Sequence, residues 1–180
     1  MISFKKYITE FKAEPYDYDW EEFTFNSGEA KFTTVNDKLI TYNIEHDKSV
    51  VIRTVDNIEH HEISFEVSLG YRGTTRKIDT GNPFRVFMTV KSLTDEYIKK
   101  FGDKIKMIIF SAAKTDEEDL GRSKLYTRFA KDWKRLYPKQ KWQAYTMDKG
   151  VEGTFFYIVN QALIESTEQE IIDKSELTKL

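Results

Sequence analysis

The fold of this chain is decided by the stretch KMIIFSA at residues 106–112. This nearly continuous apolar run has the length of a strand, and such runs are typical of a central strand that is buried on both faces. On either side of it, apolar residues recur at three- and four-residue spacing, which is the period of an amphipathic helix. The pattern predicts a buried strand between two long helices, over residues 84–101 and about 116–137.

The ends of both helices carry clear signals. Asn82 is a good N-cap, Pro83 is preorganised for the first helical position, and Gly102 and Pro138 are residues that end the two helices. Four consecutive acids at 116–119 open the second helix. Consecutive acids point in different directions, so they indicate a solvated helix start that complements the helix dipole, rather than a magnesium or calcium site.

The rest of the chain favours strands. Alternating β-branched and aromatic residues predict strands at 22–25, 31–35, 39–44, 49–53 and 62–67, joined as an antiparallel meander. Two more strands, 142–145 and 154–159, flank a hairpin turn at 148–153. We therefore expect one α+β domain with a mixed, strongly twisted sheet, antiparallel at its N-terminal end, and two long helices packed on it.

Composition excludes several classes of protein. The 180 residues contain 28 Lys or Arg and 30 Asp or Glu, a net charge of −2, so the total charge does not indicate nucleic-acid binding or attraction to an anionic membrane. There is no cysteine, which excludes disulfides, thiolate metal sites and a cysteine nucleophile. No apolar run reaches the roughly 20 residues that a membrane helix needs, and we expect no membrane association.

The three histidines are His46, His60 and His61. Neighbouring residues on a strand point to opposite faces, so His60 and His61 are poorly placed to bind one ion. We expect them at the solvated start of a strand, with no metal site.

The turn before the first long helix, residues 76–85, has the features of an anion site. The free N–H groups and the positive dipole end of a helix N-terminus favour an anion, and Arg85 adds a mobile cation beside them. A well-capped core helix without any ligand fits the same residues. Both interpretations stay open.

The order helix, strand, helix with a Leu-Tyr pair, strand resembles the C-terminal half of the GNAT superfamily of acyl-CoA-dependent acetyltransferases. The resemblance implies that Arg76, Gly81, Asn82 and Arg85 hold the pyrophosphate of acetyl-CoA. Arg76 fits the first position of the family's fingerprint and Gly81 the last, whereas Asp79 replaces the middle glycine and adds bulk and negative charge. We therefore expect no cofactor, with acetyl-CoA as the alternative.

The Leu-Tyr pair lies in the string GRSKLYTRF at residues 121–129. The GNAT resemblance implies that Tyr126, its tyrosine, protonates the leaving coenzyme A thiolate. An aromatic residue at this helical spacing also suits a core position, as do Phe129 and Trp133. Enzymatic activity is therefore uncertain, and we favour a protein that is not an enzyme.

The first residues form a separate segment. Phe4, Tyr7, Ile8 and Phe11 have the spacing of a short amphipathic helix, which fits an N-terminal helix docked on the body. The peptide also resembles the capsid-targeting sequences of internal head proteins in T4-like tailed phages, which end in a Leu or Ile, any residue, Glu signal. Here the signal would be Ile8, Thr9 and Glu10, and the resemblance implies cleavage after Glu10.

The strings at 80–87 and 121–126 are also similar to those of uncharacterised proteins of large tailed phages. We therefore expect a phage protein, located in the virion head or the host cytoplasm, whose GNAT-like scaffold contacts phage structural or host proteins. The alternative is an N-acetyltransferase. The expected organisation is a leader at 1–12, a GNAT-like domain at 16–162 and a polar tail at 163–180, either helical or disordered.

Overall fold

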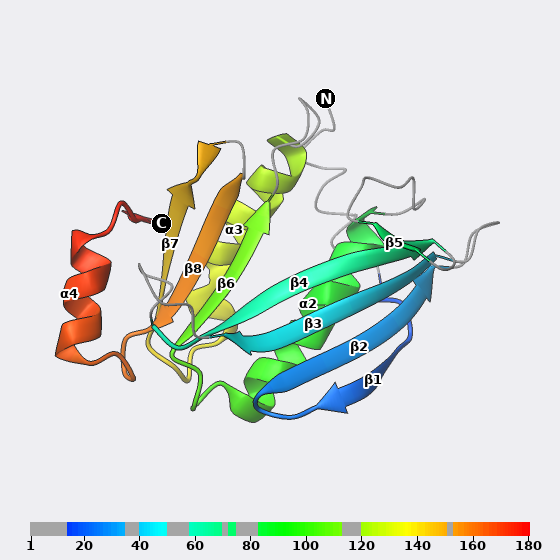
Figure 1. Cartoon of the computed structure of the whole chain (residues 1–180), viewed down its shortest axis with the longest axis horizontal. Coiled ribbons are helices and arrows are strands. Elements are labelled where there is room, and N and C mark those ends of the chain that lie inside the picture. Colours follow the sequence, from blue (N-terminus) through cyan, green and yellow to red (C-terminus); the bar gives the residue numbers. More distant parts are fainter. Residues whose placement is uncertain are drawn as a thin grey trace. The chain divides into compact units, whose positions relative to one another are not determined.

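A computed structural model of the chain describes residues 14–34, 40–49, 58–69, 72–74, 83–112, 120–150 and 153–180. It is a mixed α+β structure, as expected, and Figure 1 labels its elements apart from β9. In chain order they are β1 (Tyr18–Phe23), β2 (Ser27–Thr34), β3 (Ile40–Ser49), β4 (His60–Leu69), β5 (Arg72–Thr74), α2 (Pro83–Phe101), β6 (Met107–Ala112), α3 (Leu120–Leu136), β7 (Trp142–Asp148), β8 (Thr154–Asn160), α4 (Ser166–Lys174) and β9 (Thr178–Lys179).

The chain divides into two compact units. Unit 1 comprises residues 1–46 and 65–100, and unit 2 comprises residues 47–64 and 101–180. Strands β3 and β4 each begin in one unit and end in the other. Each unit is described below by itself.

Unit 1 is built on the hairpin of β1 and β2, which pair antiparallel from Tyr18 opposite Phe32 to Phe23 opposite Gly28. The strand predicted at 22–25 is wrong in its position, because β1 ends at Phe23. The reason is local: the hydroxyl of Thr24 accepts from the Ser27 N–H at 3.1 Å, so a side-chain turn replaces the extended backbone there.

Helix α2 supplies the core of unit 1. Val86 and Leu93 of the helix are buried with Tyr16, Ala30 and Phe32. The helix runs from Pro83 to Phe101, which confirms the prediction over 84–101. Its apolar period and the proline at its first position are both local signals, and local signals are sufficient to define such an element.

Unit 2 contains a mixed sheet in the order β4, β6, β8, β7, β9. The first pair is parallel, with His61 opposite Ile108 and Glu62 opposite Ile109. The remaining pairs, β6 with β8, β7 with β8 and β7 with β9, are antiparallel. In the β7–β8 hairpin, Lys149 N–H donates to the Gly153 carbonyl at 2.9 Å, and the φ of Gly150 is 65°, which favours glycine. The predicted hairpin is confirmed.

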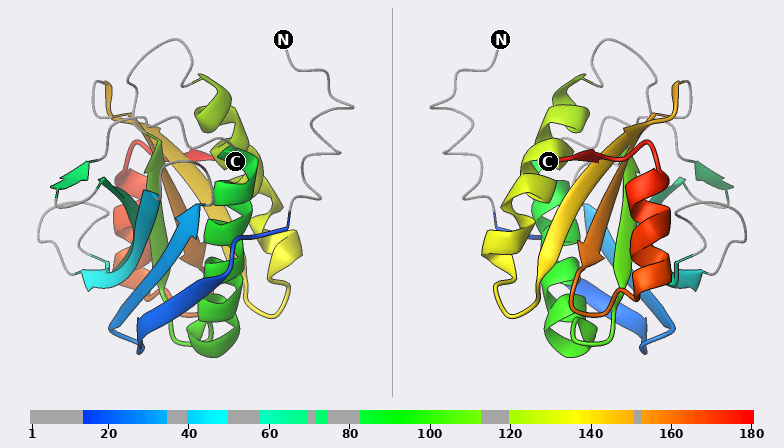
Figure 2. Two further views of the ribbon diagram at one scale, coloured as in Figure 1. Left: turned by 90° about the vertical axis from the view of Figure 1, so that its right-hand side faces the viewer. Right: turned by 90° about the vertical axis from the view of Figure 1, so that its left-hand side faces the viewer.

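The sheet of unit 2 is covered on both faces, which is why β6 is apolar except at the exposed Ser111. Helix α3 packs on β6, β7 and β8, and α4 lies on the opposite face, as the right-hand view of Figure 2 shows. Under α4, its own Ile172 is buried in a cluster with Ile58, Met107, Ile109, Tyr157 and Val159. The segment 163–180 contains α4 and β9, and Ile172 of α4 belongs to the core of unit 2.

Candidate functional site

Tyr126 lies in an aromatic cluster on the α3 face of unit 2. Its ring is half-buried and stands edge-on to the rings of Phe110 and Phe156, with centroids 5.9 and 6.4 Å away. Phe129 and Trp133 continue the cluster along the helix, and their ring centroids are 5.1 Å apart. Trp133 is fully buried, as predicted, and Phe129 is half-buried.

Tyr126 packs on the sheet just beyond the end of the parallel ladder between β4 and β6. The parallel ladder between β4 and β6 has two residue pairs and ends at Ile109, whereas β6 continues to Ala112. Phe110, which contacts Tyr126, is the first residue of β6 beyond this ladder. The tyrosine ring thus packs on the part of β6 whose described pairing is with β8 alone.

Arg85 is the one predicted cofactor residue that the described ranges include. Its Nε donates to the Glu14 carbonyl at 3.0 Å, an Nη donates to the Pro15 carbonyl at 3.5 Å, and the guanidinium lies 4.0 Å from the Tyr16 ring centroid. The side chain therefore holds the preceding chain segment against α2.

The other predicted site residues lie outside the part of the chain that the structure describes. They are Arg76, Asp79, Gly81 and Asn82 of the fingerprint turn and Ile8, Thr9 and Glu10 of the leader. Arg85 belongs to unit 1 and Tyr126 to unit 2, so each is placed within its own unit.

Arg85 begins a row of polar residues that runs along α2, with Thr89, Ser92, Glu96 and Lys100 following at spacings of four, three, four and four. We call these five residues the α2 polar stripe. Each bonds to the segment at residues 14–25. Thr89 accepts from the Tyr16 N–H at 2.8 Å, and Lys100 donates to the Phe23 carbonyl at 3.4 Å. The stripe fastens this segment along the helix.

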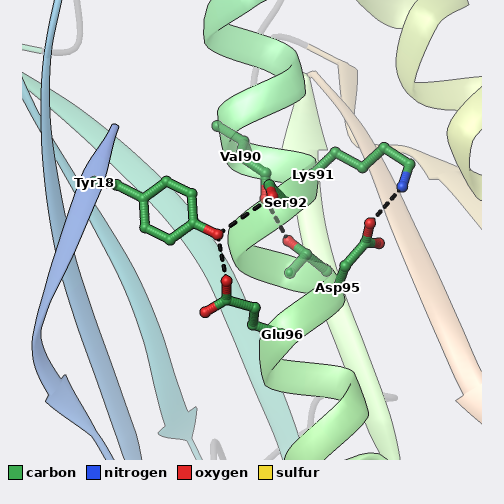
Figure 3. A network of polar contacts seen from close by, with 7 residues as sticks. Tyr18, Val90, Lys91, Ser92, Asp95 and Glu96 are labelled. Carbon is green, nitrogen blue, oxygen red and sulfur yellow. Dashed lines mark hydrogen bonds and ion pairs between the residues drawn. The ribbon is translucent and has the colours of Figure 1, made fainter. Parts of the chain in front are cut away.

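The centre of the stripe is a carboxylate with two donors. The Tyr18 hydroxyl donates to Glu96 Oε1 at 2.5 Å, and the Trp20 indole N–H donates to Oε2 at 2.9 Å. Figure 3 shows Tyr18 pointing from β1 toward Ser92 and Glu96. Because the single phenolic proton goes to Glu96, the Ser92 hydroxyl, 3.2 Å away, must be the donor in its own contact with Tyr18.

This environment keeps Tyr18 neutral. Burial raises the pKa of Tyr18 above its ordinary value of 10.0, and the hydrogen bond to Glu96 raises it further, because a phenolate would face the carboxylate. Tyr18 is therefore a hydrogen-bond donor at neutral pH and is poorly suited to act as a base.

A second polar group fastens α4 to the sheet of unit 2. Lys106 donates to Glu168 at 2.8 Å and lies 3.6 Å from Glu165, the N-cap residue of α4. The hydrogen bond to Glu168 raises the pKa of Lys106. Glu165 and Glu168 also form a capping box, so the same acids start the helix and bind the lysine.

The histidine prediction was wrong about exposure. His60 and His61 are buried, with 3% and 1% of their surfaces exposed, and the Nδ1 of His60 lies 2.9 Å from the Ile58 carbonyl oxygen. His61 pairs with Ile108 of β6 and therefore lies inside the sheet of unit 2. Among the described residues, no group of three or more acids and histidines is close enough to hold a metal ion.

Sequence reasoning did not identify the α2 polar stripe or Asn160. Asn160 is buried at the end of β8, where its Nδ2 donates to the carbonyls of Gly102 and Ile105 at 3.5 and 3.4 Å. The spacing of Thr89, Ser92 and Glu96 is a visible signal of a continuous polar row. Their partners, more than 70 residues earlier in the chain, are not visible in it.

No protein-family model, curated protein or solved structure matches this chain. Within the described ranges, none of the helices combines the length and the apolar content that crossing a bilayer requires.

Proposed function

We propose that this protein is a GNAT-like scaffold that contacts other proteins and does not use acetyl-CoA. The observation that carries the proposal is the position of Arg85, whose guanidinium bonds to the carbonyls of Glu14 and Pro15. The first residue of α2 is Pro83, which has no N–H to offer an anion. The described part of this turn therefore fits a structural helix start better than a pyrophosphate site.

The proposal includes a phage origin. The leader peptide with Ile8, Thr9 and Glu10 supports packaging of the protein in the virion head, and its GNAT-like body would then act on phage or host proteins. If packaging and processing occur, the protein from mature particles should begin at Phe11. N-terminal sequencing of virion protein tests this, and an intact Met1 would contradict cleavage.

Calorimetric titration with acetyl-CoA tests the absence of a cofactor. The wild-type protein should show no binding, and no rise in melting temperature, because only a ligand of the native state raises stability. Asp79→Gly removes the bulk and the negative charge in the fingerprint turn, and it should improve any residual binding by about fivefold, equivalent to about 1 kcal/mol. Tight binding by the wild type would contradict the scaffold proposal.

The second candidate is an acyl-CoA-dependent N-acetyltransferase with Tyr126 as its acid. It is favoured by the contact of Tyr126 with Phe110, just beyond the two-residue parallel ladder of β4 and β6. In that case Tyr126→Phe should slow acetyl transfer and leave acetyl-CoA binding nearly intact. Turnover that depends on this hydroxyl would establish the enzyme.

A further inference from the structure

A strong local charge is hidden in the nearly neutral total. Between Arg122 and Lys141 the sequence has eight Lys or Arg residues and one acid, Asp132. This segment therefore carries a net charge of +7, and the remainder of the chain carries −9, since the total is −2. Total charge gives no sign of this separation.

The structure places four of these eight cations on one side of α3. Lys124, Arg128, Lys131 and Arg135 are all exposed and follow at spacings of four, three and four, which is one face of a helix. We call these four residues the α3 basic face. The opposite side of the helix carries buried Ala130 and Trp133. With a rise of about 1.5 Å per residue, the face is about 16 Å long.

Among the residues that the structure describes, Asp132 is the acid that pairs with this face. Asp132 is shared between two guanidiniums, at 3.9 Å from Arg128 and 3.2 Å from Arg135. Lys124 and Lys131 make no ion pair with any residue that the structure describes. The helix dipole accounts for cations in the last turn only, where Lys134 and Arg135 lie, and not for Lys124 or Lys131.

We propose that the α3 basic face binds the phosphate backbone of double-stranded nucleic acid, without sequence preference. A duplex carries one charge per about 1.7 Å of axis, so about nine phosphates lie along a face of this length. The aromatic residues of α3, Tyr126, Phe129 and Trp133, pack toward Phe110 of the sheet. The exposed side therefore offers charge and no stacking platform, which favours a duplex over a single strand.

The test is fluorescence anisotropy with a labelled DNA duplex of about 20 base pairs, titrated from about 50 to 200 mM salt. Four phosphate contacts predict a slope of about −3.6 in a plot of log affinity against log salt. In the double variant Lys124→Gln/Lys131→Gln the slope should become shallower by about two. Circular dichroism and melting temperature check that the variant is folded.

The matched control is Lys174→Gln/Lys179→Gln, which changes the net charge equally at exposed positions of α4 and β9 in the same unit. It should keep the wild-type slope. The proposal is overturned by an absence of binding at the lowest salt, or by equal losses in the two double variants. Equal or tighter binding of polyglutamate, or tighter binding of a single strand, would also overturn it, because the surface would then fit an acidic protein or stack bases.

Discussion

Helices α2 and α3 are similar in length, with 19 and 17 residues, and both bury one apolar face against a sheet. Their outer faces differ. The α2 polar stripe bonds to the segment at residues 14–25, whereas the α3 basic face is exposed. Both rows have helical spacing of three and four residues, so spacing alone does not distinguish an internal contact from an external surface.

The α2 polar stripe and the α3 basic face differ in whether another part of the chain complements them chemically. The segment at 14–25 offers α2 a phenol, an indole N–H and backbone carbonyls, and the stripe provides the matching carboxylate, hydroxyls and cations. The α3 basic face has one kind of charge, and its ion pairs with described residues go to Asp132. A row of mixed polar groups is thus suited to the protein's own backbone, and a row of like charges is suited to an external polyanion.

The largest effects should come from the inner faces, where the two helices are alike. Trp133→Ala in α3 should lower the free energy of unfolding by about 3 to 5 kcal/mol, and Leu93→Ala in α2 by about 2 to 5 kcal/mol, because both side chains are fully buried. Urea denaturation measures both. An unchanged stability in Trp133→Ala would mean that this side of α3 is a surface.

The next effect tests whether the α2 polar stripe differs from an ordinary helix surface. Glu96→Ala should lower the free energy of unfolding by about 1.5 kcal/mol, since both the Tyr18 hydroxyl and the Trp20 N–H lose a charged acceptor. The control is Glu170→Ala on α4, whose exposed carboxylate has one contact with Lys174 at 3.4 Å. That change should remain within about 0.5 kcal/mol. Equal effects would remove the distinction between a stripe and an ordinary surface.

Tyr18→Phe should have a smaller effect that depends on pH. The raised pKa means that the folded state holds the phenolic proton more tightly than the unfolded state. This contribution is complete below the unfolded pKa of about 10 and is lost as pH rises through the folded pKa. The variant should be less stable by about 1 kcal/mol at neutral pH, with a difference that shrinks above about pH 10. A difference independent of pH would contradict the assignment.

The smallest effect should come from the α3 basic face. Lys124→Gln/Lys131→Gln should change the free energy of unfolding by less than about 0.5 kcal/mol, because both lysines are exposed and make no ion pair with described residues. Thermal melting at low salt is the appropriate measurement. A loss of well over 1 kcal/mol would show that these lysines serve the fold, as the α2 polar stripe does.

The sequence was sufficient to predict the helices and strands that are defined by a local residue pattern. Helix α2 and strand β6 lie within one residue of their predicted bounds, because a period, a proline and a glycine are all readable along the chain. The sequence was insufficient to predict features that depend on contacts beyond the local pattern. His61 pairs with Ile108 of β6, nearly 50 residues later, and the end of β1 depends on one hydroxyl, that of Thr24.

The candidate site follows the same division. The helical spacing of Tyr126, Phe129 and Trp133 correctly indicated packing on the sheet. The contacts of Arg85 with Glu14 and Pro15 join residues about 70 positions apart, and no local pattern reveals such a pair. The prediction of Arg85 as a mobile cation reflected its position at a helix start, without knowledge of its neighbours.

The short strand β9 has a consequence for solubility. Thr178 and Lys179 pair with Thr146 and Tyr145 of β7, and the Leu180 N–H donates to the Ala144 carbonyl at 3.0 Å. An open strand at a sheet margin is a template for association with other chains. Strand β9 covers the middle of the β7 edge, and a two-residue strand with an exposed lysine is itself a poor template for a further chain. We expect residues 178–180 to lower the tendency of unit 2 to associate through the edge of β7, a role distinct from both folding and ligand binding.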